Sequence, residues 1–166
     1  MKLKSESPMQ YRKYRLIAAV VLLSAGFAGK TLAAAPDPDF GVNGTVITSF
    51  IGPGAPNNIE AVALQPDGRI VVGGTALARF MADGALDTTF GQAGSVDVPY
   101  RIRGIAVQSD GRIVIVGETK EVSGAANLVV ARFEADGTDD GAFGDQGRTV
   151  VDISGGRDQM NAIAVA

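Results

Sequence analysis

The sequence predicts an all-β protein made of β-propeller blades with four antiparallel strands each, and three observations support this fold class. The phrase at 61–73 returns in nearly the same form at 104–117. A second phrase, Ala-Arg-Phe-Xaa-Ala-Asp-Gly, occurs at 78–84 and again at 131–137. Three Phe-Gly pairs are 50 and 53 residues apart, which is the period of a propeller blade rather than of a helical solenoid.

The first two strands of each unit are predicted from two apolar runs joined by a turn. Small alanines stand between larger residues at 62–64 and 105–107, which suits the innermost strand of a blade because space near the axis is short. The ranges 70–72 and 113–116 are unbroken β-branched runs that end at glycine, as in strands covered on both faces. An Asp-Gly pair lies between the two runs and predicts a tight hairpin, since glycine accepts a positive φ.

Two further strands complete each unit. The third strand is predicted at 77–81 and 128–134, and the fourth at 95–98 and 148–153. In an antiparallel meander these strands run from the innermost to the outermost in chain order. The resulting blades extend over 59–98 and 103–153.

Incomplete units are predicted at both ends of the propeller region. The range 44–50 matches the fourth strand of a unit, and 161–166 matches the first strand of a third unit. Two full blades and two single strands are fewer than the roughly four to eight blades of a closed ring. We therefore expect a fragment or a truncated reading frame, with assembly of several copies into a ring as the alternative. Open blade edges also predict marginal stability and self-association.

The first 35 residues are predicted to be a cleaved export signal. Basic residues between positions 2 and 15 precede an apolar run of 13 residues at 16–28, and a small-residue stretch follows at 31–35. The apolar run is shorter than the roughly 20 residues of a membrane-spanning helix, so we expect removal and no stable membrane span. The predicted location of the mature partial propeller, 36–166, is secreted, periplasmic or at the cell surface.

Composition limits the partners of the mature chain. After Ala35 the sequence has nine Lys or Arg and 17 Asp or Glu, a net charge of −8. With this negative charge we predict no binding to nucleic acid, because phosphate binding needs clustered positive charge. The chain has no cysteine, so burial rather than disulfide bonds must stabilise an exported protein of this kind.

The repeated phrases also carry a family resemblance. Gln-Pro-Asp-Gly-Arg-Ile-Val-Val-Gly-Gly at 65–74 and Ala-Arg-Phe-Met-Ala-Asp-Gly-Ala-Leu-Asp-Thr-Thr-Phe-Gly at 78–91 resemble the delta-60 repeats of bacterial exported β-propellers. The resemblance covers 37–166 and implies four-stranded blades. It implies no specific activity, because that family has no assigned general activity. The second unit departs from the pattern at 139–142, where Asp-Asp-Gly-Ala replaces Leu-Asp-Thr-Thr.

Residues that recur in every unit are predicted to be structural. The phenylalanines of this kind are expected to fill the apolar contact between blades, and they are Phe40, Phe80, Phe90, Phe133 and Phe143. Arg79 and Arg132 precede two of these rings, and each is predicted to form an ion pair with a repeated aspartate such as Asp87.

Residues that differ between the units are the predicted binding residues. The connections from the second to the third strand and from the fourth strand to the next unit vary in length, and they emerge on the same face of the meander. Variable loops on a rigid scaffold are where binding residues concentrate. The candidates on these connections are Asn57, Asn58, Tyr100, Arg101, Arg103, Lys120, Glu121, Arg157 and Asp158.

The sequence predicts no catalytic and no metal-binding residues. The chain has neither His nor Cys, which excludes a Ser-His-Asp triad, a Cys-His pair and an ordinary zinc site within it. A segment beginning at Asp136 matches a calcium loop poorly, since Thr138 holds its third position and Gly147 the twelfth, where a glutamate belongs. Weak calcium binding near Asp136, Asp139 and Asp140 is the one cofactor left open.

Two functions of different classes remain. The favoured one is a non-catalytic exported module that presents variable loops to a protein or carbohydrate, or that acts as a structural scaffold. The alternative is a fragment of a propeller-type hydrolase or lyase whose site lies in blades outside this chain. Polar residues on the innermost strands would favour the enzyme. The predicted innermost strands carry Ala, Val, Ile and Leu, which favours binding.

Overall fold

The computed structural model describes residues 35–48, 58–119 and 125–165. Every element described below belongs to Pro36–Ala166, the second of the two units into which the chain divides. The three described ranges contain no helix, and hence none long and apolar enough to cross a membrane.

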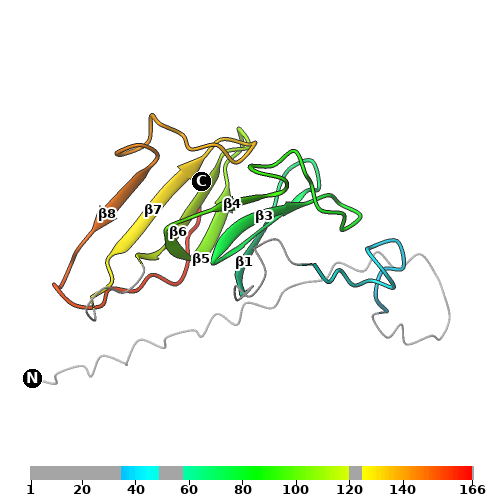
Figure 1. Cartoon of the computed structure of the whole chain (residues 1–166), viewed down its shortest axis with the longest axis horizontal. Coiled ribbons are helices and arrows are strands. Elements are labelled where there is room, and N and C mark those ends of the chain that lie inside the picture. The colour runs from blue at the N-terminus through cyan, green and yellow to red at the C-terminus, as the bar shows by residue number, and fades with distance from the viewer. Residues whose placement is uncertain (1–34, 49–57, 120–124, 166) are drawn as a thin grey trace, which may run out of the picture. The chain divides into compact units, whose positions relative to one another are not determined.

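Eight strands in these ranges form two four-stranded antiparallel sheets (Figure 1). The first sheet consists of β1 (Ile59–Leu64), β2 (Ile70–Gly74), β3 (Ala76–Phe80) and β4 (Ser95–Asp97). The second consists of β5 (Tyr100–Val107), β6 (Ile113–Thr119), β7 (Leu128–Phe133) and β8 (Arg148–Val151). Consecutive strands pair in both sheets. The prediction of an all-β fold with four-stranded antiparallel blades is confirmed.

The entry to the second blade lies earlier than predicted. β5 begins at Tyr100 rather than at 103, because the residues from Tyr100 to Ile102 continue the antiparallel pairing with β6 as far as Thr119. The connection between the two blades is correspondingly short. Residues that the sequence placed in that connection therefore lie in a strand.

The single strands predicted at the two ends are not formed in the described residues. Of 44–50, the structure describes 44–48, where Thr45 makes isolated bridges and no strand is present. Of 161–166, the structure describes 161–165, which also holds no strand. Within 35–48, 58–119 and 125–165, neither segment lies beside a strand of its own unit, and a strand without such neighbours is unstable in water.

The two middle strands of the first sheet, β2 and β3, are covered on both faces. Val71 and Leu77 are fully buried in the main hydrophobic core, which also contains Ile102 of the second sheet. Side chains alternate along a strand, so Val72 points to the other face, into a smaller core against which Val46 packs. This double burial explains why the second and third strands of the unit are nearly continuous apolar runs.

The two Asp-Gly hairpins are confirmed. Gly68 has a φ of 85° and Gly111 a φ of 87°, a conformation that side chains with a Cβ rarely adopt. Gln65 N donates to the carbonyl oxygen of Arg69 at 2.8 Å and closes the first of these turns.

An arginine, an aspartate and a phenylalanine form the same stack in each unit. Arg79 Nε donates to Asp87 Oδ2 at 2.8 Å, and the guanidinium carbon of Arg79 lies 4.7 Å from the centre of the Phe90 ring. The corresponding distances in the second unit are 2.6 Å and 4.7 Å, for Arg132, Asp140 and Phe143. The predicted ion pair of Arg79 with Asp87 is confirmed. The stack holds each ring in the connection that leads to the last strand of its sheet, β4 or β8.

The second blade docks on the first through its Ala-Asp-Gly turn. Gly91 N donates to the carbonyl oxygen of Asp136 at 2.9 Å. A Cβ on Gly137 would lie 2.9 Å from carbon atoms of the Phe90 ring, so only glycine permits this close approach. Phe90 is completely buried. Its predicted position between blades is therefore confirmed.

Phe90→Ala should destabilise the protein more than the equivalent change in the second unit. Removing a fully buried aromatic ring costs about 3–5 kcal/mol of the free energy of unfolding. Phe143 occupies the same repeat position but is only half-buried, so Phe143→Ala should cost clearly less. Urea unfolding followed by circular dichroism measures both losses. Equal losses would contradict the role of the contact between the blades.

Asp87 should make the stability of the first blade depend on pH. The hydrogen bond from the Thr89 hydroxyl, with a smaller effect of the Arg79 ion pair, holds the pKa of Asp87 below its ordinary value of 3.8. A lowered pKa in the folded state stabilises the fold above the ordinary value, and the gain is lost as the pH falls through the folded pKa.

The wild-type free energy of unfolding should therefore fall more steeply below about pH 4 than that of the Asp87→Asn variant. Urea titrations at a series of pH values test this difference. Parallel profiles of the two proteins would show that the carboxylate of Asp87 makes no pH-dependent contribution.

Candidate functional site

The two innermost strands carry a β-bulge at the same position of the repeat. In β1 the pairing shifts just before Ala61, leaving Glu60 as the extra residue. In β5 the pairing shifts just before Gly104, leaving Arg103 as the extra residue. A bulge takes one residue out of the ladder and redirects its side chain, and bulges are common beside functional sites. Here the two redirected side chains meet, because Arg103 Nη1 donates to Glu60 Oε2.

Five charged side chains extend this pair into an alternating chain, which we call the arginine–glutamate cluster. In order of contact its members are Arg101, Glu60, Arg103, Glu118 and Arg157. Arg101 Nε donates to Glu60 Oε1 at 2.6 Å, and Arg103 Nη2 donates to Glu118 Oε1 at 2.6 Å. Arg157 Nη2 donates to Glu118 Oε1 at 3.4 Å. Three arginines and two glutamates give the cluster a formal charge of +1, in a chain of net charge −3.

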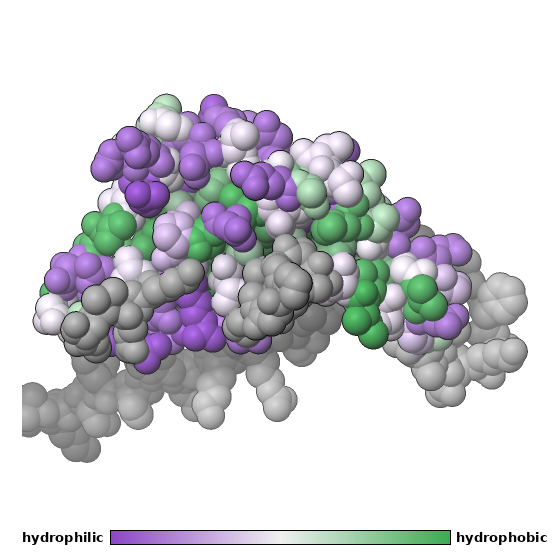
Figure 2. Space-filling view, viewed as in Figure 1, coloured by the Kyte–Doolittle hydropathy of each residue, from purple (hydrophilic) through white to green (hydrophobic). Residues whose placement is uncertain are grey.

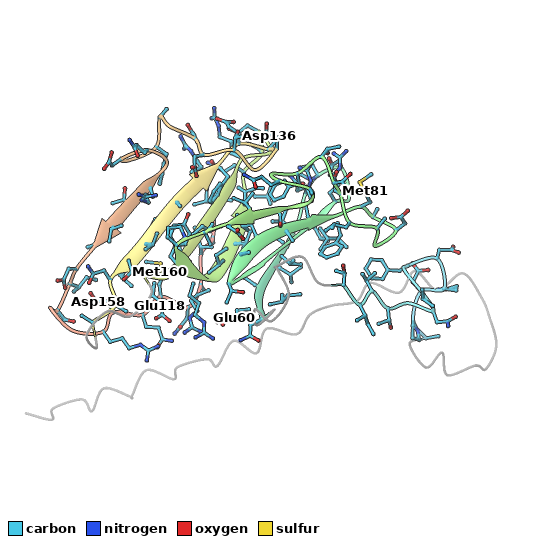
Figure 3. All side chains as sticks on the ribbon, in the orientation of Figure 1. Glu60, Met81, Glu118, Asp136, Asp158 and Met160 are labelled. Carbon is cyan, nitrogen blue, oxygen red and sulfur yellow. The ribbon has the colours of Figure 1, made fainter. Side chains whose placement is uncertain are left out.

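The cluster draws its members from both blades. Glu60 comes from β1 of the first sheet, while Arg101 and Arg103 come from β5 of the second and Glu118 from β6. Glu60 and Glu118 lie toward the same end of the strands, away from Asp136 (Figure 3). The cluster therefore exists only when the two blades are packed together.

Burial increases from the outer arginines to the inner carboxylate. The side chains of Arg101 and Arg157 are 41% and 51% exposed, whereas that of Glu118 is 4% exposed. Glu60 and Arg103 lie between these extremes. The carboxylates thus fix the arginines from inside, and the two terminal guanidinium groups face solvent.

Two buried polar atoms of the cluster could each form a further hydrogen bond. Glu118 Oε2 and Arg103 Nε have no hydrogen-bond partner among the described residues. Leaving such a buried group unpaired costs about 1–3 kcal/mol. Chemically, the cluster retains one inner acceptor and one inner donor in addition to its exposed guanidinium groups. The hydrogen bond to Glu118 raises the pKa of Arg103, so this arginine keeps its charge.

Three predicted loop residues lie in a strand instead. Tyr100, Arg101 and Arg103 belong to β5, which corrects their assignment to the connection between blades. The alternation Tyr-Arg-Ile-Arg was the available signal, because a period of two predicts a strand with one buried face. Tyr100 is 4% exposed, and burial raises its pKa to about 12. Tyr100 therefore contributes to the core, whereas the two arginines join the cluster.

The remaining predicted residues differ in their surroundings. Arg157 follows β8 and joins the cluster. Asp158 is buried and accepts hydrogen bonds from Ile153 N and Ser154 Oγ, both at 2.8 Å, so it stabilises the connection in which it lies. Asn58 is exposed and immediately precedes β1. Asn57, Lys120 and Glu121 lie outside the described residues.

Neither carboxylate of the cluster, Glu60 or Glu118, was among the predicted binding residues. The expectation of purely apolar innermost strands is wrong. β1 and β5 start earlier than their predicted alanine-containing runs, and the added residues carry charges. One signal was present: Glu60 and Arg103 occupy the same repeat position with opposite charges.

Two carboxylates of the acidic segment considered for calcium, those of Asp136 and Asp140, accept hydrogen bonds from neighbouring protein groups. Asp136 Oδ1 accepts hydrogen bonds from the backbone N and hydroxyl of Thr138, at 2.9 Å and 2.7 Å. Asp140 accepts from Arg132. Within the described residues, no three His, Cys, Asp or Glu side chains are grouped so that they could hold a metal ion.

Comparison with known proteins identifies the repeats. Residues 65–90 and 108–143 match a family described as a domain of unknown function (DUF5122) beta-propeller. Each matched segment runs from the Asp-Gly hairpin to the phenylalanine of the Phe-Gly pair of a unit, Phe90 or Phe143. The chain therefore contains β-propeller repeats. No curated protein and no solved structure matches it.

Glu118→Gln should destabilise the packing of the two blades. The change removes the buried charge that faces Arg103 and Arg157, and loss of a hydrogen bond between charged groups costs roughly 1.5–3 kcal/mol. The loss should shrink when Arg103 is already replaced by Gln, because the two residues act on the same contact. A double-mutant cycle from urea unfolding measures this coupling. Additive losses would contradict a shared contact.

Proposed function

We propose that this chain is an exported, non-catalytic β-propeller repeat module that binds an acidic segment of a partner protein at the arginine–glutamate cluster. The observation that carries the proposal is the position of Arg101 and Arg157. Both side chains are exposed and both are held by buried or half-buried carboxylates. Guanidinium groups fixed in this way are preorganised for carboxylate ligands.

Geometry and charge favour a carboxylate-bearing ligand. The planar guanidinium group presents paired N–H donors that match the two oxygens of a carboxylate, which a lysine ammonium group does not. The net positive charge of the cluster is surrounded by an acidic chain. Such a local contrast orients an acidic partner toward one site, since complementary charge controls specificity more than affinity.

Protein is favoured over carbohydrate as the partner. Sugar-binding surfaces commonly offer an exposed aromatic ring for stacking. Tyr100, the aromatic neighbour of Arg101 in β5, is instead buried in the core. The exposed part of the cluster, as far as the described residues extend, thus offers charged donors rather than a flat apolar platform.

Binding is favoured over hydrolysis or lyase chemistry. Glu60 is engaged by Arg101 and Arg103, and Glu118 by Arg103 and Arg157. An acid or base catalyst must reach the substrate proton directly or through one water. Arginines occupy both oxygens of Glu60 and Oε1 of Glu118, and the remaining Oε2 of Glu118 is buried away from solvent. Export is supported by the basic and apolar leader pattern at 1–35.

A labelled polyglutamate peptide tests the proposal in a fluorescence anisotropy titration. The Arg101→Ala/Arg157→Ala variant should bind at least about tenfold more weakly than the wild type, because charge-assisted hydrogen bonds are lost. Arg112→Ala is the matched control, since its side chain is 39% exposed and ion-paired but lies in the Asp-Gly hairpin at the other end of the strands. This control should bind like the wild type.

Three results would contradict the proposal. They are equal losses in the cluster and control variants, no binding of polyglutamate by the wild type, and preferential binding of a polyuronate over polyglutamate. The last result would identify carbohydrate as the ligand class. Added salt should weaken genuine binding, because exposed ion pairs are screened.

A further inference from the structure

The outer Phe-Gly segment of a unit occurs three times with the same backbone conformation. Its two inner positions with positive φ are Gly41 and Asn43, then Gly91 and Ala93, then Gly144 and Gln146, with φ between 50° and 58° in every case. A Cβ on the first glycine would meet the same side-chain position in each copy, namely Val46, Val96 and Thr149. We call the segments 40–46, 90–96 and 143–149 the first, second and third sockets.

The second socket is filled by the turn of the following unit. Gly91 N donates to the carbonyl oxygen of Asp136, and Gly137 lies against Phe90 and Val96. Arg79, stacked over Phe90, adds a hydrogen bond to the carbonyl oxygen of Ala135. Phe90 is fully buried, and the side chain of Arg79 is 7% exposed.

The first socket is filled in the same way by the turn of the first blade. Gly41 N donates to the carbonyl oxygen of Asp83 at 2.8 Å, and Gly84 lies against Phe40 and Val46. In the described residues, the first socket belongs to neither of the two four-stranded sheets. Its segment 36–48 forms isolated bridges only and contains no arginine to serve as Arg79 does.

The third socket has no turn on it among the described residues. Gly144, Arg148, Thr149 and Val150 line an open hollow there. Phe143 is half-buried where Phe90 is fully buried, and the side chain of Arg132 is 23% exposed. Exposed apolar residues continue along β8, where Figure 2 shows a hydrophobic patch. The sequence contains two Ala-Asp-Gly turns, at 82–84 and 135–137, and both are already docked.

We propose that the third socket binds the Ala82-Asp83-Gly84 turn of a second copy of this chain, displacing that copy's own segment 36–48. Gly144 N then donates to Asp83 of the partner copy, and Arg132 donates to Ala82, as Gly91 and Arg79 do for Asp136 and Ala135.

The third socket is the stronger competitor for the turn. It belongs to an intact four-stranded blade and supplies the Arg132 donor, whereas the first socket is a short segment that lacks such a donor. Release of that segment uncovers the contact of Phe40 and Val46 with the turn, and Phe143 and Thr149 of the third socket cover the turn in their place. Val42 and Ile47 take no part in the exchange, since they are 75% and 95% exposed already. The contact joins two different surfaces, and such head-to-tail interfaces produce rings or open chains rather than closed dimers.

Sedimentation velocity of the full chain over a range of concentrations tests the proposal with two blocked variants. Thr149→Arg fills the third socket at an exposed position of β8. Gly84→Asn places a side chain on the turn where a socket must approach it closely. Asn tolerates the positive φ of 87° at this position. Each variant should associate at least about tenfold more weakly than the wild type, because overpacking a contact costs about 1–3 kcal/mol.

A mixture of the two blocked variants provides the decisive result. Thr149→Arg keeps a usable turn and Gly84→Asn keeps a usable third socket, so equimolar mixing should restore one interface and produce a 1:1 heterodimer with no larger species. Gly68→Asn is the control for placing Asn at positive φ, since a Cβ there meets only Ala82 at an ordinary 3.6 Å. It should associate like the wild type.

A variant that weakens the contact between the first socket and the turn provides an independent test of the proposal. Phe40→Ala weakens the segment that competes for the turn, so it should strengthen association of the wild type and leave the Thr149→Arg variant unchanged. The proposal is overturned if the wild type stays monomeric at every concentration, if Thr149→Arg associates as the wild type does, or if the mixture forms no heterodimer.

Discussion

The burial of a phenylalanine ring under the glycine of the next unit's turn is the contact on which this structure depends. A four-stranded sheet that is apolar on both faces cannot remain in water alone, so each blade needs a neighbour. Gly137 against Phe90 satisfies this need for the first blade. The stack of Arg79 on the same ring adds a charged hydrogen bond to the contact, so packing and polar pairing fix the same register between blades.

Sequence reasoning succeeded where the signal is local and repeated. A β-branched run followed by glycine fixes a covered strand, and an Asp-Gly pair between two such runs fixes a hairpin. The ion pair of Arg79 with Asp87 was also predictable, because repetition implied that both residues serve the fold. Single strands at 44–50 and 161–166 were expected on the same grounds, but pairing depends on neighbours that a local pattern does not show.

The candidate site was only partly predictable because it depends on two β-bulges. A bulge changes which side chains face each other, and no residue type marks it in this sequence. Arg101, Arg103 and Arg157 were named as candidates. The reason was correct for Arg157, which lies in a connection, but wrong for Arg101 and Arg103, which lie in β5. Glu60 and Glu118 were missed, because their role appears only when the two blades are placed side by side.

The bulge occurs at the same position of both repeats, but the side chain at that position differs in charge. Glu60 and Arg103 occupy it in the two blades, and the matching position of the next repeat phrase holds Asn161. One acidic, one basic and one neutral polar residue thus occupy the same position of the repeat, while the alanines and larger apolar residues that follow it stay nearly constant. Function can therefore change at this position without any cost to the contacts that hold neighbouring blades together at their outer sides.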